Sequence, residues 1–202
     1  MLADRLKWDV TVRDNWEIDD LDGLDPLYVL SVERGQLFGS LRFLPTTGPT
    51  LLSAALATHL GLNIKIQSPH IWECSRFVVA PRQCTQRTSL RVCNVTADLM
   101  MAGCLLAQTA GIRQITGVFD KSMLQIYRRA GWVPDVIADA TTSTRTIAVG
   151  IWDVNADVLA CMIHRHGFTP AFEVDPVLND GAHDGQQQRG SLLSRQGFYS
   201  VK

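Results

Sequence analysis

The sequence predicts an α/β fold of the α+β type, in which helices flank a mixed central sheet. Strand-like segments dominate the first part of the chain, and strands alternate with helices in the rest. The chain has 202 residues, which suits one domain. Hydrophobic residues make up 46% and charged residues 19%, so such a domain can bury a sizeable core.

A hairpin is predicted near the start of the chain. Residues 27–33 (LYVLSVE) and 36–44 (QLFGSLRFL) have the composition of strands, and Gly35 lies in the short turn between them. Pro45 ends the second strand, because proline cannot donate a hydrogen bond to a ladder. Residues 51–60 then have the pattern of a short helix that Gly61 closes.

Strands and helices alternate after this point. Residues 71–80 form the next predicted strand, and later strands are predicted at 112–119, 132–138 and 144–152. The longest predicted helix, 89–110, has one apolar stripe at spacings of three and four residues, made of Val92, Val95, Leu99, Gly103, Leu106 and Ala110.

Two shorter helices and a tail complete the predicted organisation. One helix begins at Asp120 or Ser122 and closes at Gly131, and the other begins at Asp153 or Asn155 and closes at Gly167. Glycine after a helix tolerates the left-handed backbone that ends it. Residues 180–202 are polar and rich in glycine at their centre, so we predict one domain over residues 1–179 and a mobile tail after it.

Charge and cysteine content exclude several function classes. The formal net charge is −1, from 19 basic and 20 acidic residues, which gives no electrostatic reason to expect nucleic acid or an anionic membrane as a partner. The apolar runs are too short to span a bilayer and no secretion leader is evident, so we expect a cytoplasmic protein. The five cysteines form no C-x-x-C pair and no histidine has metal-ligand spacing, so we expect reduced thiols and no metal.

One predicted core strand, IWECSRFVV at 71–79, carries two opposite charges. Residues three apart in a regular strand point to opposite faces, so there are two alternatives: one of the two charges lies at the sheet surface, or a bulge adds a residue and brings Glu73 and Arg76 to one side. A buried charge needs a partner. The sequence offers Arg42 and five acidic residues before the sheet: Glu17, Asp19, Asp20, Asp22 and Asp25. Two interpretations follow: an ion-pair network that ties the N-terminal segment to the sheet, and a polar pocket for an amine-bearing substrate.

Three motifs follow one another along the chain. Trp8 precedes WEIDDLD, which is followed by GSLRFLPT and then by WECSRF. Their order and spacing resemble the acyl-homoserine-lactone synthases, the LuxI-type autoinducer synthases of bacteria, whose pattern is a tryptophan, E-x-D-x-x-D, G-x-x-R-x-x-P-T and W-E-x-S-R-F. The segment 117–132 (GVFDKSMLQIYRRAGW) is similar to a later part of the family, and the remainder matches loosely.

The resemblance implies a GNAT-like acyltransferase that makes a quorum-sensing signal. In that family S-adenosylmethionine accepts the acyl group, and an acyl carrier protein thioester is the usual donor, with acyl-CoA as the other possibility. The amine attacks the thioester, and the methionine carboxylate then closes the lactone and expels methylthioadenosine. S-adenosylmethionine is a substrate here, so no cofactor is expected.

The resemblance and the chemistry together assign roles to the charged residues. An α-amine has a pKa of about 8 and is largely protonated near neutral pH, so its attack needs a base. Glu73 is the candidate base, directly or through a water. Asp19 and Asp22 would complement the cationic substrate, and Arg42 would hold these carboxylates in place and keep them ionised. Arg76 would support Glu73 or meet the acyl or phosphopantetheine part of the donor.

The remaining candidate residues would bind substrate. Trp8 would pack on the adenosine, lie over the sulfonium in a cation–π contact, or serve as a core aromatic. Ser75 is a candidate donor in the pocket, and Phe77 is a candidate packing or lining residue. Thr116 or Gly117 falls near the position at which some family members that prefer 3-oxo chains have a threonine.

The chain departs from the family at its beginning. Family members carry an R-x-x-x-F arrangement upstream of the tryptophan, and the phenylalanine position of that arrangement falls on Leu2 here. We therefore expect a truncated or misassigned N-terminus, or a substrate site that is closed differently. Two alternatives stay open: another GNAT-type N-acyltransferase that uses acyl-CoA, and an inactive truncated relic.

Overall fold

In the computed structural model, residues 11–13, 16–33, 35–53, 61, 64–79, 88–167, 172–174 and 198–201 are described. Trp8, residues 54–60 of the short predicted helix and most of the predicted tail lie outside these described residues.

A mixed sheet forms the centre of the molecule, with the described strands in the order β7-β8-β6-β5-β4-β3-β10-β9. Strands β5 and β6 are parallel, as are β3 and β10, and the other neighbours are antiparallel. The bounds of the strands are β3 Leu27–Glu33, β4 Gln36–Pro45, β5 Ile71–Val79, β6 Gln114–Asp120, β7 Asp135–Thr141, β8 Thr146–Asp153, β9 Phe172–Val174 and β10 Phe198–Val201. A separate hairpin pairs β1 (Thr11–Arg13) with β2 (Trp16–Ile18).

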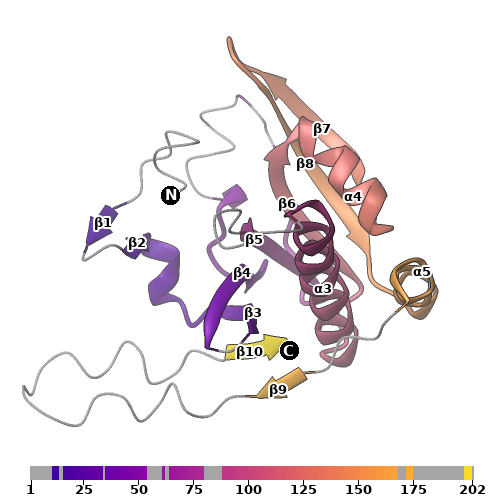
Figure 1. The fold of residues 1–202 in the computed structure, drawn as a ribbon. Helices are drawn as coiled ribbons and strands as arrows, with labels where there is room; N and C mark the ends of the chain where they lie inside the picture. The colour runs from indigo at the N-terminus through magenta and orange to yellow at the C-terminus, as the bar shows by residue number, and fades with distance from the viewer. Residues whose placement is uncertain are drawn as a thin grey trace, which may run out of the picture.

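The described α-helices gather on one face of this sheet (Figure 1). They are α3 (Thr88–Thr109), α4 (Leu124–Ala130) and α5 (Ala156–His166), and the three contact one another. Two short 3₁₀ helices are η1 (Asp20–Gly23), between β2 and β3, and η4 (Lys121–Met123), directly before α4.

The two faces of β4 have different neighbours. Leu41 and Phe43 are buried in the hydrophobic core together with residues of α3, whereas Arg42 between them binds acidic residues of the η1 segment. Because side chains alternate along a strand, the helices and η1 lie on opposite faces of the sheet. Gly103 of α3 permits a close approach to β4, since a Cβ at this position would lie 3.0 Å from the Phe43 ring.

Most of the elements predicted from the sequence are present. The mixed sheet flanked by helices is confirmed, and the predicted hairpin is β3 and β4, with Gly35 at a φ of +75° in its turn. Asn155 is the residue that caps α5. The strand predicted at 132–138 begins later, because β7 starts at Asp135. Within the segment predicted as a tail, β10 pairs in parallel with β3.

A bulge interrupts β5. Of the two alternatives for this strand, a charge at the sheet surface or a bulge, the structure has the bulge. Between the pairs Ser40–Val78 and Arg42–Ser75, β5 has one residue more than β4. Arg76 lies inside this interval with a φ of +51°, a left-handed backbone that is rare for a residue with a side chain. The strained residue is therefore one of the two charged residues that the sequence marks in this strand.

Strands β5 and β6 part beyond the first half of their length. They pair only from Ile71–Gln114 to Cys74–Gly117, although β5 continues to Val79 and β6 to Asp120. Over the remaining length β6 still pairs with β8, and β5 with β4. A gap therefore opens in the middle of the sheet, beside the bulge.

No helix among the described residues is long and apolar enough to cross a membrane.

Candidate active site

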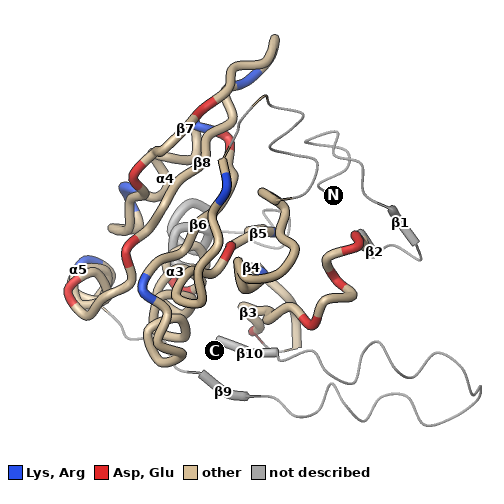
Figure 2. Tube along the Cα trace, turned by 180° about the vertical axis from the view of Figure 1, so that it is seen from behind, with Lys and Arg blue, Asp and Glu red and all other residues tan. Residues whose placement is uncertain are grey.

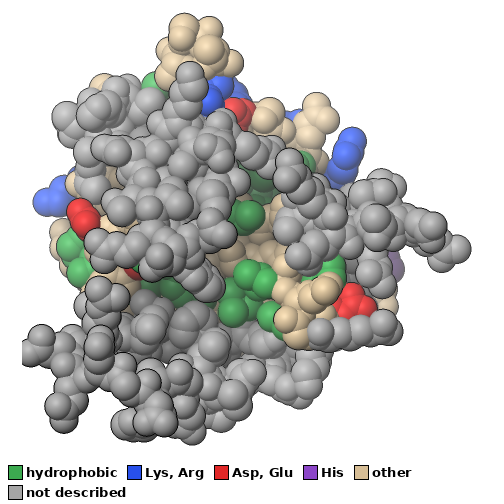
Figure 3. All heavy atoms as spheres, turned by 60° about the vertical axis from the view of Figure 1, so that its left-hand side comes forward, with side chains coloured by type: hydrophobic (Ala, Val, Ile, Leu, Met, Phe, Trp, Pro, Cys, Tyr) green, Lys and Arg blue, Asp and Glu red, His purple; other side chains and the backbone are tan. Residues whose placement is uncertain are grey.

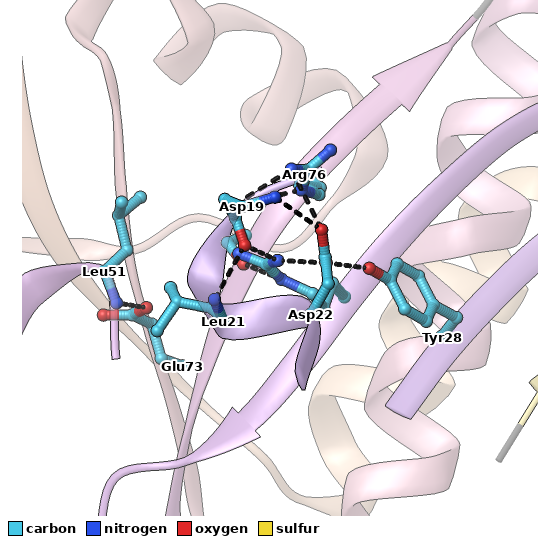
Figure 4. A network of polar contacts seen from close by, with 9 residues as sticks. Asp19, Leu21, Asp22, Tyr28, Leu51, Glu73 and Arg76 are labelled. Carbon is cyan, nitrogen blue, oxygen red and sulfur yellow. Dashed lines mark hydrogen bonds and ion pairs between the residues drawn. The ribbon is translucent and has the colours of Figure 1, made fainter. Parts of the chain in front are cut away.

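A charged cluster lies between β4, β5 and η1, and Figure 4 labels Asp19, Asp22 and Arg76 of this cluster. A buried arginine of β4 lies at its centre. The side chain of Arg42 is 1% exposed, and its Nη1 lies 2.7 Å from Asp19 Oδ1 and 2.5 Å from Asp22 Oδ1. Its Nε donates to Ser75 Oγ at 3.0 Å. A guanidinium presents its donors in a fixed fork, so this arrangement holds two carboxylates and a hydroxyl in one geometry.

The η1 turn places both aspartates. Asp19 caps the turn by accepting the Leu21 N–H at 3.0 Å, and Asp22 Oδ2 accepts the Asp19 N–H at 2.9 Å, which together form a capping box. Figure 2 shows the acidic residues, in red, along the segment between β2 and β3. The same two side chains therefore order the turn and bind the sheet.

Arg76 approaches the aspartates from β5. Its Nη2 lies 3.0 Å from Asp19 Oδ2 and 3.3 Å from Asp22 Oδ2. The bulge makes this contact possible, because it brings Arg76 to the face of β5 that Ser75 also uses. The two guanidinium groups and the two carboxylates carry equal and opposite charge, so the cluster as a whole is neutral.

The charges of the cluster stabilise one another. Burial alone would raise the pKa of Asp19, but hydrogen bonds and charges from Arg42 and Arg76 outweigh burial and lower the pKa. Burial would likewise lower the pKa of Arg42, and Asp19 reverses this so that the pKa is raised. Tyr28 donates to Asp22 Oδ1 at 2.5 Å, and burial together with this bond raises the pKa of Tyr28 to about 12. The sequence-based expectation that Arg42 holds the two aspartates in place agrees with this geometry.

Glu73 has a different set of partners. Glu73 is 1% exposed, and its carboxylate accepts the backbone N–H of Leu51 at 2.7 Å and that of Leu52 at 2.8 Å, one on each oxygen. Burial raises the pKa of Glu73, and the N–H groups of Leu52 and Leu51, the Thr50 hydroxyl and the charge of Arg42 offset this only in part. Glu73 thus ties the 50–53 segment to the sheet. A raised pKa makes the ionised carboxylate a better proton acceptor.

A cavity of about 510 Å³ opens where β5 and β6 part. Its lining is mainly apolar and comes from β4, β5, β6, α3 and α4, with Trp132 and Trp152 among the walls. Figure 3 shows that described hydrophobic side chains, in green, reach the surface in the middle of one face of the molecule. Ser75 and Arg76 also line this cavity, so they belong both to the charged cluster and to the apolar space.

The remaining predicted site residues lie near this junction. Phe77 lines the cavity and packs against the core. Thr116 is fully buried, pairs in register with Glu73, and donates its hydroxyl to the Gly150 carbonyl at 3.1 Å. Thr116 is not among the residues that line the cavity.

Sequence reasoning missed three features of this site. The backbone amides of Leu51 and Leu52 leave no trace in the residue types, and no sequence signal identifies them as partners of a buried carboxylate. Tyr28 reads as an ordinary strand aromatic, although its place at the start of the strand that directly follows the acidic segment is a signal that could identify it. Tyr127 lies on the inner side of a short helix and reads as core, and only its hydroxyl distinguishes it from an apolar residue.

The fold and the site define a class of protein. A mixed sheet whose two central parallel strands part over an apolar cavity, with helices on one face, is the GNAT-like acyltransferase fold.

Comparison with known sequences gives the family. The model of the family described as autoinducer synthase matches residues 1–158, and the chain belongs to this family. It is 41% identical over 159 residues to an acyl-homoserine-lactone synthase of Rhizobium etli, and this alignment covers 78% of this chain and 74% of that protein. It is 35% identical over 134 residues to an acyl-homoserine-lactone synthase of Pseudomonas aeruginosa, which covers 65% of each protein.

Solved structures agree with this assignment. The structure of MesI, a CoA-dependent acyl-homoserine lactone synthase, superposes with a TM-score of 0.69 at 25% identity and covers 84% of this chain and 83% of MesI. The crystal structure of the acyl-homoserine-lactone synthase LasI gives a TM-score of 0.64 at 28% identity, with 80% of each chain covered.

Proposed function

We propose that this protein is an acyl-homoserine-lactone synthase, which acylates S-adenosylmethionine and makes a quorum-sensing signal in the cytoplasm of a bacterium. In the first step the α-amine nitrogen attacks the carbonyl carbon of an acyl thioester, the carbon–sulfur bond breaks, and the donor leaves as a thiol with the proton of the amine. In the second step the methionine carboxylate oxygen attacks its own γ-carbon. The bond from that carbon to the sulfonium breaks, and methylthioadenosine leaves as a neutral product.

One observation carries this proposal: Ser75 and Arg76 connect a charged cluster to an apolar cavity. The reaction joins a charged, water-soluble acceptor to an acyl chain, so a site for it needs both environments in contact. The bulge at Arg76 and the parting of β5 from β6 provide this junction.

The gap between the strands suits the arm of the donor. Beyond Cys74, the described ladder joins β5 only to β4, so the edge of β5 that faces β6 offers backbone donors and acceptors to a ligand. Phosphopantetheine is a linear chain with two amides, and an extended amide-bearing chain can add to such an edge. Acyl carrier protein and CoA both present this arm, so both are candidate donors.

The charged residues take roles that follow from their contacts. Glu73 accepts the proton of the amine, directly or through a water, because burial raises its pKa toward the range of a useful base. Arg42 positions Asp19 and Asp22, and Arg76 lies closest to the cavity, where it can meet the acyl thioester or the acceptor carboxylate. All bonds made and broken lie in the two substrates, so the reaction as written uses no cofactor and no metal.

Product analysis tests this proposal. The full chain is incubated with S-adenosylmethionine and with either an acyl carrier protein thioester or the matching acyl-CoA, and the organic and aqueous phases are both analysed by mass spectrometry. We expect acyl-homoserine lactone, methylthioadenosine and free thiol in equal amounts with at least one donor. Thiol release together with an N-acyl product but without methylthioadenosine would identify another N-acyltransferase, and the absence of all products with both donors would refute an active synthase.

A further inference from the structure

The hydroxyl of Tyr127 lies in the apolar cavity without a partner among the described residues. Tyr127 is 7% exposed and lines the cavity. Among the described residues, every fully enclosed side-chain nitrogen or oxygen has a hydrogen-bond partner. The Tyr127 hydroxyl has none, so it must touch open space, and the cavity is the space that its residue borders. A tyrosine hydroxyl at a buried position normally finds a partner, because leaving one unmade costs free energy.

The ring that carries this hydroxyl is held in place. Tyr127 meets Phe119 with ring centroids 5.3 Å apart and Trp152 at 5.2 Å, in both cases edge to face at 88°. The two indole N–H groups nearby are already used, since Trp132 donates to the Asp153 carbonyl at 2.9 Å and Trp152 to the Trp132 carbonyl at 3.2 Å. In this aromatic wall, the hydroxyl of Tyr127 is thus the polar group left for a ligand.

We infer that Tyr127 selects acyl chains that carry an oxygen substituent, a hydroxyl or an oxo group, near their carbonyl end. This inference rests on the proposed function and names the acyl class that the cavity takes. Both substituents accept a hydrogen bond from a phenol. An unsubstituted chain would leave the hydroxyl without a partner, and a site built to bond a polar group rejects the analogue that lacks it.

The place of the substituent follows from the neighbours of Tyr127. Tyr127 and Cys74 both line the cavity, and Cys74 is the last β5 residue that pairs with β6. The next two residues of β5 are Ser75 and Arg76, at which the cavity meets the charged cluster. The hydroxyl therefore lies near the reacting end of the cavity. Burial raises the pKa of Tyr127, so the group stays protonated and acts as a donor at physiological pH.

Two threonine hydroxyls are weaker candidates than Tyr127 for binding the oxygen substituent of the acyl chain. Thr116 already donates to the Gly150 carbonyl and does not line the cavity. Thr96 lines the cavity at 6% exposure and has no partner among the described residues, but it lies within α3, where a threonine hydroxyl can turn to the carbonyl one turn earlier. The phenol of Tyr127 has no such local alternative.

A competition experiment tests the assignment. The full chain receives S-adenosylmethionine and an equal mixture of an unsubstituted, a 3-hydroxy and a 3-oxo acyl donor of the same chain length, each in turn as carrier-protein and CoA thioester. Mass spectrometry gives the ratio of the lactone products. We expect the native chain to prefer at least one substituted donor, and Y127F to reduce that preference roughly three- to tenfold, the worth of one neutral hydrogen bond. We expect T96V and T116V to keep the native ratio.

Each other outcome counts against the inference in a distinguishable way. If no donor yields lactone, the proposed function fails and the inference falls with it. If lactone forms but the native chain prefers the unsubstituted donor, or if Y127F keeps the native ratio, the synthase assignment stands and the role of Tyr127 is wrong. If T96V or T116V removes the preference and Y127F does not, the selectivity belongs to that threonine. The melting temperature of Y127F confirms that the variant is folded.

Discussion

The two regions that meet at β5 satisfy their polar groups in opposite ways. In the charged cluster, Arg42, Arg76, Asp19 and Asp22 bind one another, and the cluster is complete without a ligand. In the cavity, the Tyr127 hydroxyl has no partner among the described residues. A region whose groups are paired contributes to folding and holds a fixed geometry, whereas a region with an unpaired group is prepared for a ligand.

This difference explains why the two aspartates are poor candidates for neutralising a cationic substrate by themselves. Each already faces two guanidinium groups, so the pair offers no net negative charge. Their clearest role is to orient the arginines, and Arg76 carries that orientation into the cavity wall.

Removing the central arginine should have the largest effect on the charged cluster. R42M leaves two partly buried carboxylates without their main partner and leaves Ser75 without its donor, so we expect a loss of about 3–5 kcal/mol in the free energy of unfolding. Urea unfolding measures this. R129M, at an exposed position of α4, is the control and should change stability by less than about 0.5 kcal/mol. Equal effects of the two substitutions would contradict the central place given to Arg42.

A methyl group where the strands part should disturb the cavity. A Cβ at Gly117 would lie 3.0 Å from the Cys74 carbonyl oxygen and 3.4 Å from the Trp152 ring, so we expect G117A to cost about 1–3 kcal/mol and to lower activity toward every acyl donor. The matched control is G48A, whose Cβ would meet nothing nearer than 3.9 Å. Thermal unfolding and kcat/KM would decide. Native activity and stability in G117A would contradict this prediction, because they would show that the cavity wall accommodates a methyl group at this position.

Two buried carboxyls should respond to pH with opposite sign. Burial raises the folded-state pKa of Glu73, so its contribution to stability falls as pH rises from the unfolded value of about 4.3 through the folded value. The cluster lowers the folded-state pKa of Asp19, so its contribution is present above about 3.9 and is lost as pH falls through the folded value.

The matching variants separate these contributions. E73Q should flatten the loss of stability on the neutral side of pH 4.3, and D19N should flatten the loss on the acidic side of pH 3.9. Both are measured by urea unfolding between about pH 3 and pH 8, and the slope against pH is the result, since each variant also loses hydrogen bonds. The opposite roles would be ruled out if E73Q and D19N changed the slope of stability against pH in the same direction.

The smallest effect is expected at the cysteine between the two regions. Burial raises the pKa of the Cys74 thiol to about 12, so the reactive thiolate is scarce at neutral pH and direct attack by the amine needs no acyl-cysteine. C74A should therefore keep kcat within about threefold. Incubation of the native chain with an acyl donor alone, followed by intact mass spectrometry, should show no acyl adduct. An adduct on Cys74 would replace direct transfer with a two-stage mechanism.

The sequence predicts the charged cluster better than it predicts the rest of the site. The sequence identifies Arg42, Asp19, Asp22 and Arg76, because a charged residue in a core strand must find an opposite charge. The bulge was one of two alternatives, and choosing between them needs the register of β4 against β5.

The parts that the sequence does not reveal depend on backbone geometry. The partners of Glu73 are two backbone N–H groups, which every residue except proline offers. The cavity arises because β5 and β6 stop pairing after Cys74, and the loss of strand pairing has no local signature in either strand. Trp132 was assigned to a strand, but it precedes β7 and lines the cavity instead.

Arg76 provides the most direct test of the central claim, because it lies in both regions. Steady-state kinetics of R76M should give a higher KM for S-adenosylmethionine and also a higher KM for the acyl thioester, with kcat/KM lower by at least about tenfold for each, while the variant stays folded. The two substrates would then share one junction at the bulge. Native kcat/KM toward both substrates in a folded R76M would contradict the account.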